Sequence, residues 1–142
     1  MISKQLSVFI ENRQGRLGEV LGVLKENGVN ILSLSLADTT EFGLLRLIVS
    51  DPKLAAENLV KNGFSSMLTD ILVVRIDHKS GSLQKLLEIL SAKDINVEYM
   101  YGLSVEGEKA TIVLKADDLK KADAILAENG VSTLSNKEIV EF

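Results

Sequence analysis

The chain has 142 residues, of which 46% are apolar and 25% are charged, and it contains one histidine and no cysteine. This composition is globular. It excludes a disordered chain and a disulfide framework, and we expect neither a metal site nor a cofactor. The formal net charge is −4, with basic residues scattered among acidic ones, so we expect no nucleic-acid partner. No apolar run reaches about 18 residues and no signal sequence is visible, so we expect a cytoplasmic protein that does not bind a membrane.

The first half of the chain predicts the element order strand, helix, strand, strand, helix, strand. Apolar alternation and apolar runs place the strands at Lys4–Ile10, Asn30–Ala37, Phe42–Ser50 and Phe64–Leu68. A stripe of leucine and valine at helical spacing follows the polar loop Glu11–Arg16, and this helix ends at Gly28, since glycine tolerates a left-handed conformation. A turn is expected at Asp38–Glu41. Asp51 caps the second helix, and a proline follows it in the first turn.

The second half predicts the same order. Its strands are expected at Ile71–Ile76, Ile95–Gly102, Ala110–Ala116 and from Val131 onward. An apolar stripe over Leu83–Leu90 predicts the first helix of this half. Asp117 or Asp118 caps the second helix, which stops at Gly130. Residues 69–70 alone separate the last strand of the first half from the first strand of the second, so no flexible linker is expected.

An internal repeat underlies this order. The stretch Glu11–Asn30 returns as Asp77–Asn96, 66 positions later, with glycine, leucine and asparagine residues conserved between the two copies. The offset has grown to 67 at Gly63 and Gly130. One residue has therefore been inserted in the second copy, and we expect it in the Ser104–Glu108 hairpin.

The repeat predicts two domains, 1–69 and 70–142, and an α+β fold. Each domain is expected to be a ferredoxin-like βαββαβ unit, in which two helices cover one face of an antiparallel sheet. Strands that are apolar on both sides leave the other face in need of a partner. We therefore expect a homodimer.

The loop ENRQGRL at Glu11–Leu17, followed by a helix and then GVNI, resembles the ACT domain. This is a small ligand-binding regulatory module found attached to or beside enzymes of amino-acid metabolism. The resemblance covers the whole chain, twice, and is closest to small bacterial proteins built of two ACT domains. The matching phrases are Leu6–Asn12, Gly15–Leu17, Ser35–Thr39, Phe42–Asp51 and Ile95–Tyr101. The resemblance implies a sensor that binds an amino acid and has an enzyme of amino-acid metabolism as its partner.

The resemblance also implies a ligand site. In ACT domains the ligand typically lies between two units, against the loop before the first helix and the start of the second strand. Serine-binding ACT units resemble this chain at Asn12 and Asn30, although Ile10 stands where they have a histidine. The expected ligand-binding residues of both copies are Asn12, Arg13, Gln14, Gly15, Arg16, Leu17, Asn30, His78, Lys79, Ser80, Gly81, Ser82, Leu83 and Asn96.

Elementary chemistry independently favours an anion at both loops. The first N–H groups of a helix have no partner within it and point outward at the positive end of its dipole, which suits a carboxylate. Gly15 and Gly81 allow a ligand to approach the backbone closely. Arg13 and Lys79 add positive charge, and asparagine offers the donors and acceptors that a zwitterion needs.

Simpler roles compete with ligand contact. Asn12 and Asn30 also suit a turn and a strand entry whose amides fix the loop. His78 also suits a solvated loop, and Tyr99 and Tyr101 suit core or interface packing.

Three other functions compete with amino-acid sensing. A regulatory subunit would act through protein contact alone, without a ligand. An RNA-binding module shares the ferredoxin-like fold but needs aromatic residues on two strands and a basic surface. A mutase-like enzyme shares the fold too, but the sequence offers no nucleophile beside a base, no paired carboxylates and no phosphate loop, so we expect no catalysis.

Overall fold

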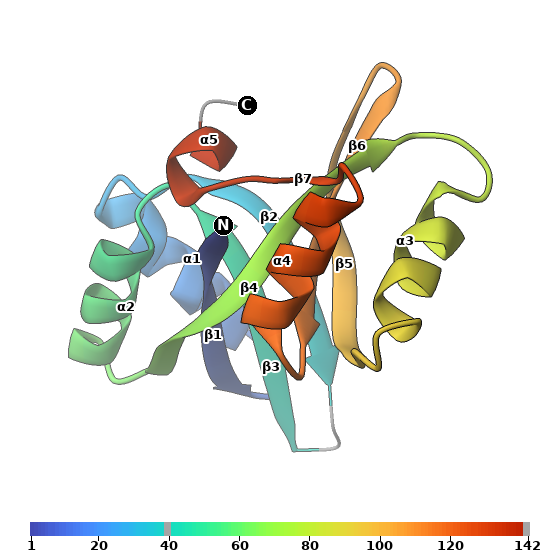
Figure 1. Ribbon diagram of the computed structural model, residues 1–142. Helices are drawn as coiled ribbons and strands as arrows, with labels where there is room; N and C mark the ends of the chain where they lie inside the picture. The colour runs from blue at the N-terminus through green and yellow to red at the C-terminus, as the bar shows by residue number, and fades with distance from the viewer. Residues whose placement is uncertain (39–40, 141–142) are drawn as a thin grey trace. The chain divides into compact units, whose positions relative to one another are not determined.

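The computed structural model describes residues 1–38 and 41–140 (Figure 1). The chain divides into two compact units. The N-terminal unit is Lys4–Thr69, and the C-terminal unit consists of Met1–Ser3 together with Asp70–Phe142. Thr39 and Thr40, at the centre of the predicted turn Asp38–Glu41, lie outside the described residues.

The N-terminal unit is a four-stranded sheet with two helices. Its elements are β1 (Ile2–Glu11), α1 (Arg16–Glu26), β2 (Ile31–Asp38), β3 (Phe42–Val49), α2 (Pro52–Lys61) and the first part of β4 (Ser65–Asp77). The strand order is β2-β3-β1-β4, and β3 runs antiparallel to both of its neighbours. Leu6 and Val8 of β1 share a buried core with Val20 and Leu24 of α1 and Leu59 of α2. Both helices therefore cover the same face of the sheet.

The C-terminal unit repeats this plan. Its elements are the rest of β4, α3 (Ser82–Ser91), β5 (Val97–Glu106), β6 (Lys109–Ala116), α4 (Leu119–Glu128), β7 (Ser132–Thr133) and α5 (Asn136–Val140). β4 pairs antiparallel with β6 and β7, and β6 pairs antiparallel with β5. Leu72 and Val74 share a core with Leu86, Leu90 and Leu126 of the two helices. The predicted duplicated βαββαβ fold, with helices on one face of each antiparallel sheet, is confirmed.

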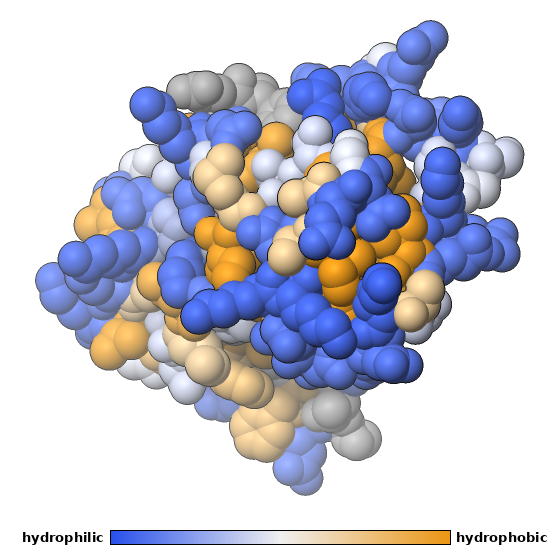
Figure 2. All heavy atoms as spheres, viewed as in Figure 1, coloured by the Kyte–Doolittle hydropathy of each residue, from blue (hydrophilic) through white to orange (hydrophobic). Residues whose placement is uncertain are grey.

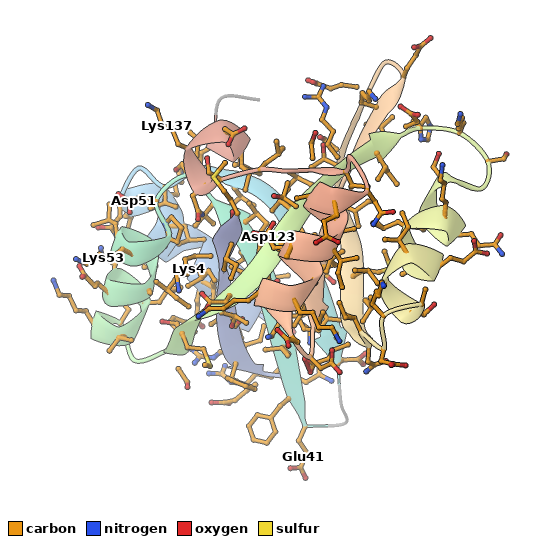
Figure 3. The ribbon with its side chains drawn as sticks, in the orientation of Figure 1. Lys4, Glu41, Asp51, Lys53, Asp123 and Lys137 are labelled. Atoms are coloured by element: carbon orange, nitrogen blue, oxygen red, sulfur yellow. The ribbon has the colours of Figure 1, made fainter. Side chains whose placement is uncertain are left out.

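Side-chain caps start the second helix of each unit as the sequence predicts. Asp51, labelled in Figure 3, accepts a hydrogen bond from the N–H of Leu54 at 3.1 Å. In the C-terminal unit the cap is Asp118, which accepts from the N–H of Lys121 at 3.0 Å. Asp117, the alternative cap, accepts a hydrogen bond from the N–H of Asn96 instead. The two candidate aspartates therefore have separate roles.

The expected break between two strands at residues 69–70 was wrong. β4 is one strand of 13 residues, Ser65–Asp77. The stretch contains no glycine or proline, so nothing in the sequence interrupts an extended backbone. The Thr69 hydroxyl lies 2.8 Å from that of Ser7 on β1.

The predicted last strand, from Val131 onward, is shorter than expected. β7 covers only Ser132–Thr133, and the helix α5 follows it. Ser135 and Glu138 explain this helix, since each side chain accepts a hydrogen bond from the backbone N–H of the other, at 3.2 Å in both cases. This is a capping box.

The inserted residue of the second copy lies in a strand. In β5, Gly102 and Ser104 pair with neighbouring residues of β6, which leaves Leu103 as a β-bulge. The equivalent part of β2 pairs without an interruption. The insertion therefore precedes the predicted Ser104–Glu108 hairpin by one position.

The first residues of the chain pack on the C-terminal unit. The ammonium group of Met1 bonds to the carboxylate of Asp123 at 2.7 Å and to the hydroxyl of Thr133 at 2.6 Å. Asp123 projects from α4, as Figure 3 shows. This explains why the N-terminal residues belong to the unit formed by the second half of the chain.

Candidate ligand site

Both predicted loops end at a glycine that begins a helix. Gly15 has φ +88° and Gly81 has φ +85°, which are left-handed conformations that favour glycine. A Cβ atom built on either one would meet nothing within 4 Å in the part of the chain that the structure describes. The turn itself therefore requires these glycines. Neither helix has a side-chain cap from the described residues. The first N–H group of each helix donates to its own loop, that of Arg16 to the carbonyl of Arg13 at 3.4 Å and that of Ser82 to the carbonyl of Lys79 at 3.2 Å, so only the N–H groups that follow are candidates for an anion.

In the N-terminal unit, the loop is held by backbone bonds and an ion pair. The N–H of Asn12 donates to the carbonyl of Glu41 at 2.9 Å, and Gln14 is exposed. The Nε of Arg13 lies 2.8 Å from the Glu11 carboxylate, and this hydrogen bond and charge hold the pKa of Glu11 below its ordinary value. The cation predicted to attract a ligand is thus already paired within its own loop.

The loop of the C-terminal unit is built in the same way. The N–H of His78 donates to the carbonyl of Glu108 at 2.7 Å, and His78 and Ser80 are exposed. Asp77 pairs with the ammonium of Lys109 at 2.5 Å, and this contact holds the pKa of Asp77 below its ordinary value, with smaller contributions from Lys79 and Lys85. In this unit the carboxylate of Asp77 therefore pairs with Lys109 of β6, and not with Lys79, which is the loop residue equivalent to Arg13.

The two strand asparagines lie at the far ends of the helices from these loops. Asn30 lies four positions after Glu26, the last residue of α1, and its N–H donates to the hydroxyl of Ser50 at 2.8 Å. The helix has 11 residues, so at ~1.5 Å per residue its ends are about 16 Å apart. Asn12 and Asn30 of one unit therefore do not meet at a single small ligand. The joint role predicted for Asn12, Asn30, His78 and Asn96 stays a prediction.

A cavity of about 260 Å³ opens in the C-terminal unit. We call it the C-terminal cavity. Its walls are the end of β4, the first turns of α3, the start of β6 and the turn after α4. Of the predicted site residues, it brings together Lys79 and Ser82. Gly81 and Leu83, which flank Ser82, are both exposed.

Sequence reasoning missed most of the polar residues of this cavity. They are Arg75, Asp77, Lys85, Lys109 and Asn129. One signal was available, because antiparallel pairing of the first and third strands of the unit places Asp77 opposite Lys109. The contribution of the turn after α4 was not available, since it depends on how α4 packs beside α3.

The equivalent place in the N-terminal unit is filled by its own side chains. The repeat aligns Ser82 of the C-terminal unit with Arg16 of the N-terminal unit. It aligns Val131 with Phe64. The guanidinium carbon of Arg16 lies 4.3 Å from the centre of the Phe64 ring, and its terminal nitrogen lies 2.6 Å from the Glu19 carboxylate. The Arg16 side chain is only 17% exposed. Arg16 packs into its own unit, and the partly buried Leu17 packs against the core. Ligand binding by these two residues stays a prediction.

A second, open groove of about 380 Å³ lies at the other end of α1. It is lined by residues from the end of this helix and the start of β2, including Lys25, Asn30 and Ile31. Its only predicted site residue is Asn30. Asn30 therefore lines this groove, but no residue of the loop Glu11–Arg16 does.

Within residues 1–38 and 41–140, the helices are too short or too polar to cross a lipid bilayer. The same residues contain no cluster of three or more histidine, aspartate or glutamate side chains arranged to hold a metal ion.

A family model described as ACT domain pair matches residues 1–142. The chain belongs to the ACT domain family. Its two units are tandem ACT domains, as the loop and strand phrases of the sequence indicated.

Solved structures agree with this assignment. The ACT pair is similar to protein BT0572 from Bacteroides thetaiotaomicron, with 36% identity and a TM-score of 0.95 over 100% of this chain and 98% of that chain. It is also similar to the regulatory subunit of aspartate kinase from Thermus thermophilus, with 16% identity, a TM-score of 0.64 and coverage of 88% and 91%. The corresponding subunit from Thermus flavus has 17% identity, a TM-score of 0.61 and coverage of 87% and 88%. The two Thermus likenesses show the fold alone. Among curated proteins, no sequence matches the chain.

Proposed function

We propose that this ACT domain pair is a non-catalytic regulatory protein that binds an amino acid and acts on an enzyme of amino-acid metabolism. The observation that carries the proposal is that the ACT domain pair accounts for residues 1–142. Two structures with the same fold are named regulatory subunits of aspartate kinase. These two names support an enzyme of amino-acid metabolism as the partner of this ACT domain pair.

The loops before α1 and α3 support amino-acid binding. Uncapped N–H groups at the start of a helix suit a carboxylate, and exposed amide side chains such as Asn12 suit an ammonium group. Binding regulates a partner only if the ligand prefers one of two states of the protein. The free energy of that preference sets the coupling between the amino acid and the enzyme.

A thermal-shift screen against the twenty amino acids tests the proposal. A ligand at a hundredfold excess over its Kd stabilises the folded protein by about 2.7 kcal/mol, which raises the midpoint by several degrees. We expect one amino acid or a chemically related group to produce this shift. A flat response to all twenty from a cooperatively folded sample contradicts amino-acid binding.

Variants locate the response. Asn12→Ala removes an exposed amide from the loop of the N-terminal unit, and we expect a smaller shift with the active amino acid. Asn62→Ala is the matched control, since Asn62 is also exposed but ends α2. An equal response in both variants removes Asn12 from the site.

A regulatory subunit that acts by protein contact alone is the second candidate. Large apolar side chains are exposed on β2 and β3, including Leu34, Leu36 and Phe42. Such a surface suits another protein. A pull-down of the purified partner enzyme in dialysed buffer separates the two functions, because a contact-only subunit binds equally with and without amino acid.

The same surface supports a homodimer. β2 lies at the edge of the sheet of the N-terminal unit, and its Leu34 and Leu36 are 46% and 47% exposed. An exposed apolar edge strand is a ready site for pairing with a second copy. Light scattering with Leu34→Lys tests this proposal: we expect the wild-type mass to be that of two chains and the variant mass to fall.

A further inference from the structure

Positive charge gathers in the C-terminal cavity although the protein as a whole is acidic. Arg75, Lys79, Lys85 and Lys109 line it beside one carboxylate, Asp77, while the net charge of the chain is −4. Asp77 and Lys109 neutralise each other across 2.5 Å. Lys79 and Lys85 form no ion pair with any residue that the structure describes. The cavity therefore has an excess of positive charge, which attracts an anion.

The remaining walls suit a small charged molecule with a short carbon chain. Ser82 brings a hydroxyl and the start of α3, whose N–H groups favour negative charge. Ile76, Leu86 and Ile89 provide an apolar wall. In Figure 2, hydrophobic atoms lie between α4 and α3 and are bordered by hydrophilic ones. The volume of about 260 Å³ is below the ~300–1,000 Å³ of most ligand pockets, so the occupant is small.

The N-terminal unit shows what removes such a site. Where the C-terminal unit has Ser82, it has Arg16, which stacks on Phe64. Where the C-terminal unit has Lys85, it has Glu19, which pairs with Arg16 at 2.6 Å. The larger side chains occupy the space, and the carboxylate cancels the charge. Equivalent positions of the repeat thus line an open cationic cavity in one copy and form a packed ion pair in the other.

We propose that the C-terminal cavity binds a small dianion, either a dicarboxylate or a phosphate, and that the N-terminal unit has no such site. Lys79 and Lys85 supply the positive charge, and the small side chain of Ser82 leaves the cavity open. The cavity shares Lys79, Ser82 and the start of α3 with the proposed amino-acid site. The inference does not require an amino acid to bind there, because it rests on the charge and volume of one cavity within one unit.

Isothermal titration of the full chain with succinate, aspartate, inorganic phosphate and acetate tests the proposal. Ionic strength is kept equal throughout, since salt screens exposed charges. We expect at least one dianion to bind at least tenfold more tightly than acetate. Succinate and phosphate represent the two sources of a dianion, and binding of either supports the site. Aspartate carries an ammonium group and has a net charge of −1, so binding of aspartate alone reports amino-acid binding and overturns the dianion proposal. Equal binding of acetate, or binding of none of the four, overturns the proposal.

Charge reversal locates the binding. Lys85→Glu introduces the residue type that the N-terminal unit has at this position, and we expect a loss of affinity of at least tenfold. Lys120→Glu is the matched control, because Lys120 is exposed on α4, does not line the cavity and gives the same change in net charge. Equal losses in the two variants contradict the assignment of the cavity.

Exchange of the filling side chains is the second arm. The double variant Ser82→Arg, Val131→Phe copies the pair found in the N-terminal unit and should abolish dianion binding. Circular dichroism checks that it folds. Undiminished binding by the folded double variant overturns the proposal, and if it does not fold, Lys85→Glu against Lys120→Glu decides.

Discussion

The two ACT domains of this chain share the order of their elements up to the second helix and differ in the side chains beside the start of the first helix. In both, a glycine with positive φ starts the first helix, and an aspartate caps the second. In the N-terminal unit, Arg16 and Phe64 pack together beside that helix start. In the C-terminal unit, smaller residues leave a cavity lined by lysine. A duplicated fold thus keeps its framework through caps and turns, while two or three side chains decide whether a cavity opens beside the first helix.

The largest effect expected from this comparison is in the two cores. Leu6 and Leu72 occupy equivalent positions, and both are fully buried. Leu6→Ala and Leu72→Ala should each lower the free energy of unfolding by about 2–5 kcal/mol, through lost apolar contact and the cavity left behind. Urea denaturation measures both. A cost below about 1 kcal/mol for one of them would show that its core is not packed like the other.

The helix caps come next. Asp51→Ala and Asp118→Ala each remove a carboxylate that accepts a backbone N–H, and each should cost about 1 kcal/mol. Asparagine at either position keeps an accepting oxygen, so Asp51→Asn and Asp118→Asn should each lower the free energy of unfolding by only about 0.3 kcal/mol. If Ala and Asn variants are equally destabilised, the carboxylate does not act as the cap.

A smaller effect on stability is expected at the equivalent positions Arg16 and Ser82, where the two units differ. Arg16→Gln removes the contact with Phe64 and the ion pair with Glu19, and should lower the free energy of unfolding by about 0.5–1 kcal/mol. Ser82→Gln, at the equivalent position, has no such contacts to lose and should stay within about 0.5 kcal/mol of wild type. Thermal denaturation of both variants measures the difference, and equal losses would contradict the asymmetry.

The smallest effect concerns pH. Hydrogen bonds from Arg13 and Lys109 hold the pKa of Glu11 and of Asp77, respectively, below their ordinary values. A depressed folded pKa contributes stability above the unfolded pKa, and that contribution disappears as pH falls through the folded pKa. Arg13→Gln and Lys109→Gln should therefore reduce the loss of stability on acidification from about pH 6 to about pH 3. Both pairs are exposed, so added salt should weaken the effect. An unchanged acid profile in both variants contradicts the pairing.

Much of the fold could be predicted because its signals are local. Apolar periodicity placed the helices, and Asp51 and Gly28 marked a start and an end. The continuous strand β4 was missed, because a repeat boundary was taken as a strand boundary although no glycine or proline marks it. The helix α5 was readable from Ser135 and Glu138, which form its capping box.

The candidate site was less predictable because it depends on packing. The loop residues followed from the repeat and the family resemblance, but the cavity forms where α3, α4 and two strand ends meet. The contact of Arg16 with Phe64 joins residues 48 positions apart. Nothing in the spacing of the sequence indicates that these two side chains stack, or that their counterparts leave a space.

The most direct test is a map of backbone amide chemical shifts during a succinate titration of the isotopically labelled full chain. The structure predicts that shifts concentrate at Asp77–Lys79, at the start of α3 and at Asn129–Val131, while Arg16–Val20 in the N-terminal unit stays unchanged. Equal shifts at the start of both helices, or shifts confined to the N-terminal unit, would contradict the difference between the two ACT domains.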